Sequence, residues 1–191
     1  MDKTKSIKSF FSIGVSYEKA DAEIRGKFTF FPDAVSSFVE EGKKIGIDNF
    51  FVVSTCNRSE FYGFAESPEF IMELYCKYTN GSIEEMKKVV SIQKNDQVIE
   101  HLFNVAEGLN SQILGDFEII GQIKIWFKRF KKHGSSSAFL ERLVNTAIQI
   151  SKKVKTETTL SNGAASVSFA AVQYILATQT DISKKNILLY G

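Results

Sequence analysis

The spacing of apolar residues changes along this chain, and that change limits the folds that it can adopt. Residues 10–15 and 50–53 are short apolar runs typical of β-strands, and residues 33–46 between them have the apolar spacing of a helix. Residues 61–65 are aromatic or small and indicate a third strand. The first third of the chain therefore predicts a βαβ start followed by another strand.

Helical signals dominate from there on. Pro68 opens one short helix, and Ser82 with Glu85 three residues later forms a capping box for another. From residue 95 one apolar stripe recurs at helical spacing, and Asp116 can cap a helix that runs to His133. A further helix carries its apolar stripe on Leu140, Leu143, Val144, Ala147, Ile150 and Val154.

The last part of the chain has a different character. Residues 156–163 are polar and indicate a connection, and residues 164–177 predict a helix of small residues that packs closely. Residues 186–190 predict a buried parallel strand, and Gly191 after it is typical of the turn that begins a dinucleotide-binding unit. We expect an α/β (α+β) catalytic domain with a small sheet and several helices over residues 1–156. Residues 157–191 would be a connection and the start of a Rossmann-type domain.

Composition places the chain among ordinary globular proteins, with 43% apolar and 24% charged residues. Its two cysteines and its polar first residues, which lack a signal sequence, predict a reducing cytoplasmic location without disulfides. No apolar run approaches the roughly 20 residues that a membrane-spanning helix needs. No membrane span is predicted.

The formal net charge of +2 is too small to indicate a nucleic-acid partner by itself. Two local basic clusters exist, and solvated helix faces explain them more readily than RNA contacts do. The clusters consist of Lys124, Lys128, Arg129, Lys131 and Lys132, and of Lys152, Lys153 and Lys155.

Cys56 has the setting of a reactive cysteine. It lies in a predicted loop between strands among polar residues, with Arg58 two positions later. A cysteine reacts as its thiolate, which nearby positive charge and exposure favour. Cys76 lies on a predicted helix without such neighbours and is interpreted as structural. From the residues alone, a packing role for Cys56 also stays open.

Few other groups are suited to acid–base chemistry. His101 lies beside the apolar stripe of its predicted helix, where a hydrogen-bonded, half-buried histidine is as reasonable as a catalytic one. His133 ends a helix, where the helix dipole is a sufficient explanation. No Cys and His cluster has the spacing of metal ligands, so no metal site is predicted.

Three ordered motifs resemble one enzyme family. Residues 54–64, STCNRSEFYGF, resemble the STCNR(T/S)E signature of glutamyl-tRNA reductases. Residues 106–116, AEGLNSQILGD, followed by GQIK at 121–124, resemble that family's ASGLDSxxLGEPQILGQVK. Residues 152–172, KKVKTETTLSNGAASVSFAAV, resemble KRVRTETxIxxGAxSVSxAAV.

The resemblance implies a reaction. Cys56 would attack the aminoacyl ester of glutamyl-tRNA, release the tRNA and hold a glutamyl thioester. NADPH would reduce that thioester to glutamate-1-semialdehyde, a precursor of tetrapyrroles such as haem. The family's substrate contacts fall on Thr55, Asn57, Arg58, Ser111, Asp116, Phe117, Glu118 and Gln122.

Roles for individual residues follow from the same resemblance. His101 falls on a histidine important for activity, as a proton donor to the leaving ribose oxygen or as a group that orients the thiol. Arg58 can hold the free side-chain carboxylate of the glutamyl group and so reject glutamine. Gly191 falls at the start of the NADPH-binding turn.

Some positions depart from the family pattern. Tyr17 stands where the family's NHKTAP has histidine, and Asp116, Phe117 and Glu118 stand where it has Glu-Pro-Gln. Substrate contacts are therefore least secure at Phe117 and Glu118. Asn110 replaces an aspartate, which is a mild change.

The family also implies partners and an incomplete chain. A chain that stops at the first glycine of the NADPH turn would form or hydrolyse the thioester without reducing it. The longer protein would be a homodimer through a C-terminal helical domain, with glutamate-1-semialdehyde aminotransferase as a partner. A non-catalytic RNA- or protein-binding domain and a cysteine acyl hydrolase are the alternatives.

Overall fold

A four-stranded sheet lies at the centre of the molecule in the computed structural model, which describes residues 8–158, 160 and 167–188. The strands are β1 (Ser9–Ser16), β2 (Phe50–Ser54), β3 (Arg58–Ala65) and β4 (Ser91–Lys94). Their order is β2-β3-β1-β4, and every neighbouring pair is antiparallel.

The expected βαβ start is right about strand direction and wrong about adjacency. β1 and β2 run parallel because each pairs antiparallel with β3. β3 lies between them, since the three-residue turn after β2 is too short for a crossover and returns the chain beside β2. β3 also begins at Arg58, three residues before the predicted strand.

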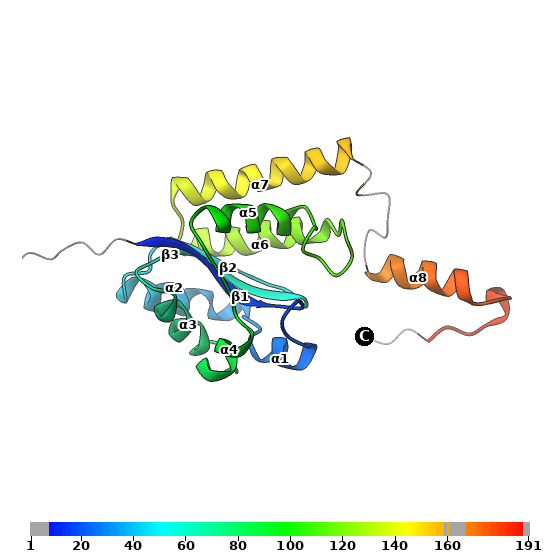
Figure 1. Cartoon of the computed structure of the whole chain (residues 1–191), viewed down its shortest axis with the longest axis horizontal. Helices are drawn as coiled ribbons and strands as arrows, with labels where there is room; N and C mark the ends of the chain where they lie inside the picture. Colours follow the sequence, from blue (N-terminus) through cyan, green and yellow to red (C-terminus); the bar gives the residue numbers. More distant parts are fainter. Residues whose placement is uncertain (1–7, 159, 161–166, 189–191) are drawn as a thin grey trace, which may run out of the picture.

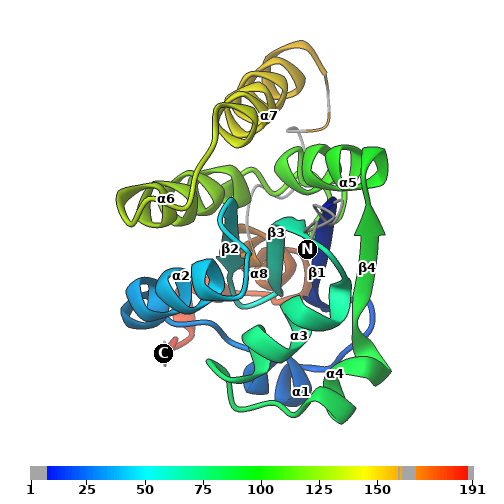
Figure 2. The same ribbon diagram turned by 90° about the vertical axis from the view of Figure 1, so that its left-hand side faces the viewer.

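Helices cover both faces of the sheet (Figure 1). On one face lie α1 (Ala22–Lys27), α2 (Val35–Lys44), α3 (Pro68–Cys76) and α4 (Ile83–Val89), and on the other α5 (Asp96–Ala106), α6 (Glu118–Lys132) and α7 (Ala138–Glu157). Figure 2, turned by 90°, shows the sheet between these two sets. The predicted helix starts are confirmed at Pro68 and at the Ser82–Glu85 capping box, in which both hydrogen bonds are present.

Aromatic side chains join the helices to the sheet. Phe130 of α6 lies 5.7 Å from Phe50 and 6.3 Å from Phe38 between ring centroids. On the other side of β2, Phe127 meets Phe51 edge to face at 5.3 Å. α6 therefore contacts both faces of β2 along the edge of the sheet.

Side chains also satisfy the free edge of β2. Ser135 Oγ accepts from the Phe50 N–H at 3.2 Å and donates to the Phe50 carbonyl at 2.8 Å. The Trp126 indole N–H donates to the Ser54 carbonyl at 2.7 Å. Because buried backbone groups need partners, Ser135 fixes the first residue of β2, and Trp126 fixes the last, from which the Cys56 turn continues.

The C-terminal predictions are only partly confirmed. α8 (Val167–Thr178) is the predicted helix, but it extends away from the sheet (Figure 1) and exposes Val172 and Tyr174 by 53% and 70%, so the expected close packing is wrong. Ile187 and Leu188 are exposed and belong to no strand, because no described strand lies beside them to pair with. The remainder of the predicted strand and Gly191 lie outside the described residues. None of the described helices is long and apolar enough to cross a membrane.

Candidate active site

Cys56 lies on an ordered turn between β2 and β3, as predicted. The Thr55 N–H donates to the Arg58 carbonyl at 2.8 Å, and Thr55 Oγ1 accepts from the N–H groups of Asn57 and Arg58 at 3.2 Å each. Threonine suits this position because its hydroxyl can replace a backbone acceptor within a tight turn. The turn is closed upon itself while Cys56 stays exposed.

Two contacts hold the turn from outside. The Tyr17 N–H, just after β1, donates to the Asn57 carbonyl at 2.9 Å. Arg25 of α1 donates from Nε to the Cys56 carbonyl at 3.2 Å. Both bonds are accepted by backbone carbonyls of the turn, so neither of them engages the Cys56 thiol.

A pocket of about 190 Å³ opens beside Cys56. It is lined by Thr55, Cys56, Asn57, Arg58, Ser111, Asp116, Glu118, Ile119, Gln122 and Ser168. Its volume is below the roughly 300–1,000 Å³ of pockets that enclose drug-sized ligands, so it suits a small group such as one aminoacyl residue.

A tight loop before α6 brings the second wall of the pocket to Cys56. Gly108 and Gly115 have φ of 74° and 79°, which favour glycine, and the Gly115 N–H donates to the Gly108 carbonyl at 3.0 Å. A Cβ on Gly108 would lie 2.7 Å from the Asp116 nitrogen. Asp116 Oδ1 then accepts from the Glu118 N–H at 3.0 Å, but the N-cap residue of α6 is Phe117, one position after the predicted cap.

A buried polar cluster stands behind the pocket on β3. Arg58 and Glu60 point to the same face of the strand, and their side chains are only 2% and 4% exposed. Arg58 Nη1 lies 3.1 Å from Glu60 Oε1, and Arg58 Nη2 donates to the Asn110 carbonyl. His101 Nε2 lies 3.2 Å from Glu60 Oε1, and the Tyr62 hydroxyl donates to Glu60 Oε2 at 2.6 Å.

The cluster has strongly shifted protonation equilibria. Burial alone would raise the pKa of Glu60, but the Arg58 charge and the His101 hydrogen bond outweigh it and lower that pKa to about 2. Burial also opposes the charge of Arg58, but Glu60 raises the Arg58 pKa above its usual value. Burial, followed by the Glu60 charge, raises the pKa of Tyr62 well above its usual value. At neutral pH the cluster is an ion pair with a neutral tyrosine.

Comparison with known proteins identifies the family of this chain. A family model described as "Glutamyl-tRNAGlu reductase, N-terminal domain" matches residues 13–158. The chain belongs to the glutamyl-tRNA reductase family. The resemblance of the three sequence motifs is therefore confirmed at the level of the family.

Individual relatives agree with this assignment. The glutamyl-tRNA reductase of Christiangramia forsetii is 55% identical over 184 residues, which are 96% of this chain and 44% of that protein. Glutamyl-tRNA reductase 2 of Flavobacterium johnsoniae is 54% identical over 183 residues, 96% of this chain and 42% of that protein. The solved glutamyl-tRNA reductase from Methanopyrus kandleri has a TM-score of 0.70 and 27% identity, covering 90% of this chain and 40% of that one. The chain spans less than half the length of each of these relatives.

The pocket gathers most of the residues expected from the reductase family. Thr55, Cys56, Asn57, Arg58, Ser111, Asp116, Glu118 and Gln122 all line it. Phe117 does not line it: it precedes α6, and the Lys155 ammonium lies 5.7 Å from its ring centroid. His101 does not line it either, because its side chain faces Glu60.

Three residues of the site were not identified as functional from the sequence. Glu60 was missed because the strand was expected to begin at residue 61, which concealed its alternation with Arg58 and Tyr62. Ile119 lines the pocket from the apolar stripe of α6, and Ser168 lines it from the first turn of α8. The one signal that could have identified Glu60 was the STCNRSE motif, which contains it.

The described residues do not fit NADPH. A dinucleotide site of the expected type needs a glycine-rich turn from a strand into a helix. The connections from β1 to α1, from β3 to α3 and from β4 to α5 contain no glycine. Within the described part of the chain, no group of three or more His, Cys, Asp or Glu side chains is placed to hold a metal ion.

Proposed function

We propose that this chain carries the acyl-transfer half of the glutamyl-tRNA reductase reaction, with Cys56 as the nucleophile. The observation that carries the proposal is an exposed cysteine on a fixed turn, in a small pocket shared with the buried cation Arg58. For a protein of the relatives' full length, we also propose reduction by NADPH to glutamate-1-semialdehyde, the first step of tetrapyrrole synthesis from glutamate. The homodimer and the aminotransferase partner belong to the same proposal.

The acyl transfer is a simple exchange. The Cys56 sulfur bonds to the carbonyl carbon of the glutamyl ester, and the bond between that carbon and the ribose oxygen breaks. The thiol proton is transferred to the ribose oxygen, which leaves as the free hydroxyl of the tRNA. The product is a thioester, from which water or a hydride donor can take the acyl group.

The charges around the pocket match a glutamyl group. That group carries a side-chain carboxylate and a free α-ammonium, since its α-carboxyl is esterified to the tRNA. Arg58 offers N–H donors for the carboxylate. Asp116 and Glu118 bring acidic side chains to the same pocket, where they suit the ammonium. A neutral glutaminyl group has no carboxylate to pair with Arg58, so it would lose this charged contact.

The proposed tRNA contact surface runs along α6. Gln122 lies at the pocket, and Lys124, Lys128 and Lys131 line a groove between α6 and α7. α6 has 15 residues and so spans about 22 Å. An acceptor strand that enters the pocket at one end of α6 would therefore meet these lysines along the helix.

The proposal is tested by following the ester bond of glutamyl-tRNA in the presence of the 191-residue chain. Wild type is expected to accelerate the loss of this ester. Cys76→Ser is expected to do the same, because Cys76 is half-buried against Met86 and burial raises the pKa of its thiol to about 11. Cys56→Ser is expected to leave the rate at that of the tRNA alone. A wild type that binds without cleaving the ester would indicate a binding domain instead, and undiminished cleavage by Cys56→Ser would indicate another nucleophile.

A further inference from the structure

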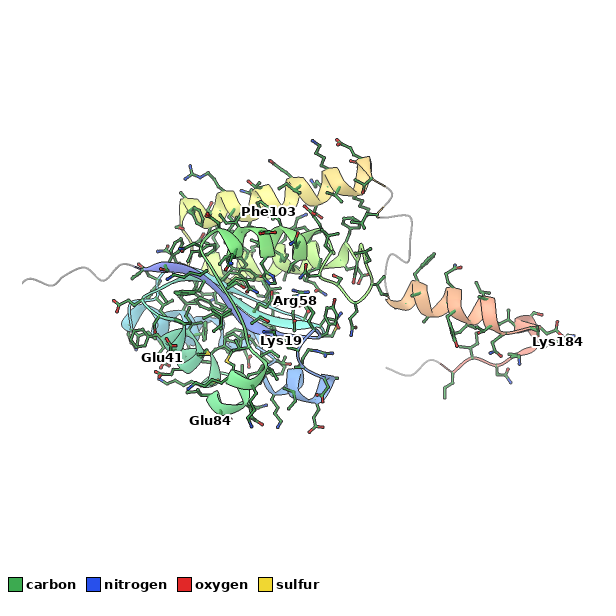
Figure 3. The ribbon with its side chains drawn as sticks, in the orientation of Figure 1. Lys19, Glu41, Arg58, Glu84, Phe103 and Lys184 are labelled. Carbon is green, nitrogen blue, oxygen red and sulfur yellow. The ribbon has the colours of Figure 1, made fainter. Side chains whose placement is uncertain are left out.

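The cluster behind Arg58 connects to the pocket at a single residue. His101 of α5 contacts Glu60, Glu60 contacts Arg58, and of these three only Arg58 lines the pocket. Figure 3 shows Arg58 on the strands, beneath the helices that include Phe103 of α5. A direct role of His101 on the substrate would need it to reach past Glu60 and Arg58.

The proton on His101 is already engaged. Glu60 is ionised, so its oxygens can only accept hydrogen bonds. His101 therefore presents Nε2–H to Glu60 Oε1, and the Tyr62 hydroxyl occupies Glu60 Oε2. The ring of His101 also stacks on that of Tyr62, at 6.2 Å and 21° between planes. These contacts fix the imidazole in one orientation, with Nε2–H directed toward the carboxylate.

The strand next to β3 fixes Glu60 as well. Gly14 of β1 is paired with Glu60, and a Cβ on Gly14 would lie 2.6 Å from both Cα and Cγ of Glu60. The missing side chain of Gly14 therefore leaves the space that the Glu60 side chain occupies. Glu60 is held by backbone packing on one side and by hydrogen bonds on the other.

We infer that Glu60 and His101 are positioning residues, which hold the Arg58 guanidinium where it meets the side-chain carboxylate of the incoming acyl group. This inference rests on the proposed function. His101 acts through Glu60, and Glu60 acts through Arg58, whose second anchor is the Asn110 carbonyl of the pocket loop. The guanidinium keeps further N–H groups for the substrate. Acyl specificity thus depends on two residues that do not touch the acyl group.

A conservative replacement separates positioning from proton transfer. Glutamine at position 101 can donate an amide N–H to Glu60 but cannot exchange a proton at neutral pH. Positioning predicts that His101→Ala raises the concentration of glutamyl-tRNA at half-maximal transfer by about tenfold, the effect of one hydrogen bond to a charged group, with little change in the maximal rate. His101→Gln is expected to restore wild-type values to within about threefold, and Glu60→Gln to behave like His101→Ala.

Other outcomes overturn the inference. If both His101 variants lower the maximal rate equally, with half-saturation unchanged, His101 transfers a proton. His133→Gln is the matched control, since His133 is exposed at the end of α6, and it should change neither parameter.

Two readouts need no turnover and therefore stay decisive even if the proposed function fails. Nitrogen NMR of the imidazole should show His101 protonated at Nε2 in wild type at neutral pH; an unprotonated Nε2 contradicts the cluster.

Alkylation of Cys56 by iodoacetamide in a Cys76→Ser background should proceed equally fast in wild type and His101→Ala, because Thr55, Tyr17 and Arg25 hold the turn. Slower alkylation in His101→Ala would mean that His101 acts on the thiol. Failure of wild type to take up glutamate refutes only the proposed function.

Discussion

At the scale of the residue, Arg58 combines a buried charge with a position on the pocket wall. Its guanidinium reaches Glu60 and the Asn110 carbonyl together, which requires a planar group with several donors. We expect Arg58→Lys to lower glutamyl transfer from tRNA by about 10- to 100-fold, because one ammonium cannot keep both anchors and pair with a carboxylate. Transfer from glutaminyl-tRNA, measured in parallel, should change far less. An unchanged preference for glutamyl over glutaminyl would show that Arg58 does not read the side chain.

Glu60 makes stability depend on pH. Its pKa is about 2 in the folded chain, against 4.5 for an ordinary glutamate. A lowered folded pKa stabilises the fold above the unfolded value, so this contribution is complete above about pH 4.5 and is lost as the pH falls toward 2. The free energy of unfolding from urea titrations should therefore fall steeply below pH 4.5 in wild type.

Glu60→Gln should remove part of that pH dependence. At pH 7 it should also destabilise the chain by roughly 3–5 kcal/mol, because the buried Arg58 charge loses its partner. Glu66→Gln, at an exposed residue just after β3, serves as the control and should stay within about 0.5 kcal/mol of wild type. Equal acid sensitivity of Glu60→Gln and wild type would mean that Glu60 does not form the ion pair.

At the scale of the element, β2 is held by a serine outside the sheet. Ser135→Ala removes both side-chain bonds to the Phe50 backbone and should cost about 1–3 kcal/mol, the desolvation of groups left without partners. Ser136→Ala is a close control, because the buried Ser136 hydroxyl has no hydrogen-bond partner among the described residues. It should be neutral or slightly stabilising in thermal unfolding. Equal losses of stability in the two variants would argue against the role of Ser135.

The sequence predicted the elements of this fold unevenly, for identifiable reasons. Helices with local signals, such as the Ser82 capping box and the start at Pro68, were correctly placed because those signals lie within or beside the helix itself. The start of β3 was missed because Arg58 and Glu60 are polar, and their pairing with Ser16 and Gly14 of β1 is not visible in the local sequence. The prediction of a strand at residues 186–190 was wrong over its described part, residues 186–188. A parallel strand depends on partners that the local sequence does not contain.

The site followed the same rule. Sequence motifs, which reflect the chemistry directly, identified Cys56 and four later pocket residues: Ser111, Asp116, Glu118 and Gln122. The relation of His101 to Glu60 was not, because these residues are 41 positions apart and meet only when α5 packs on the sheet.

At the scale of the whole molecule, only one of the two helical layers is proposed to contact tRNA. α6 and α7 carry the basic groove, whereas α4 lies across the sheet (Figure 1). Replacing Lys124 and Lys128 by alanine should weaken tRNA binding and reduce its salt slope by about one for each phosphate that is no longer neutralised. Lys87→Ala with Lys88→Ala on α4 removes the same charge and should leave the slope unchanged. Binding measured across a range of salt concentrations decides between a local contact and a general charge effect.

The central claim, that Cys56 accepts the glutamyl group, is tested most directly by locating the covalent intermediate. The chain would be mixed with glutamyl-tRNA, quenched in acid, digested and analysed by mass spectrometry. We predict one glutamyl group on the peptide that contains Cys56, in wild type and in Cys76→Ser, and none in Cys56→Ser. A glutamyl group on Cys76, or loss of the ester with no modified Cys56, would contradict it.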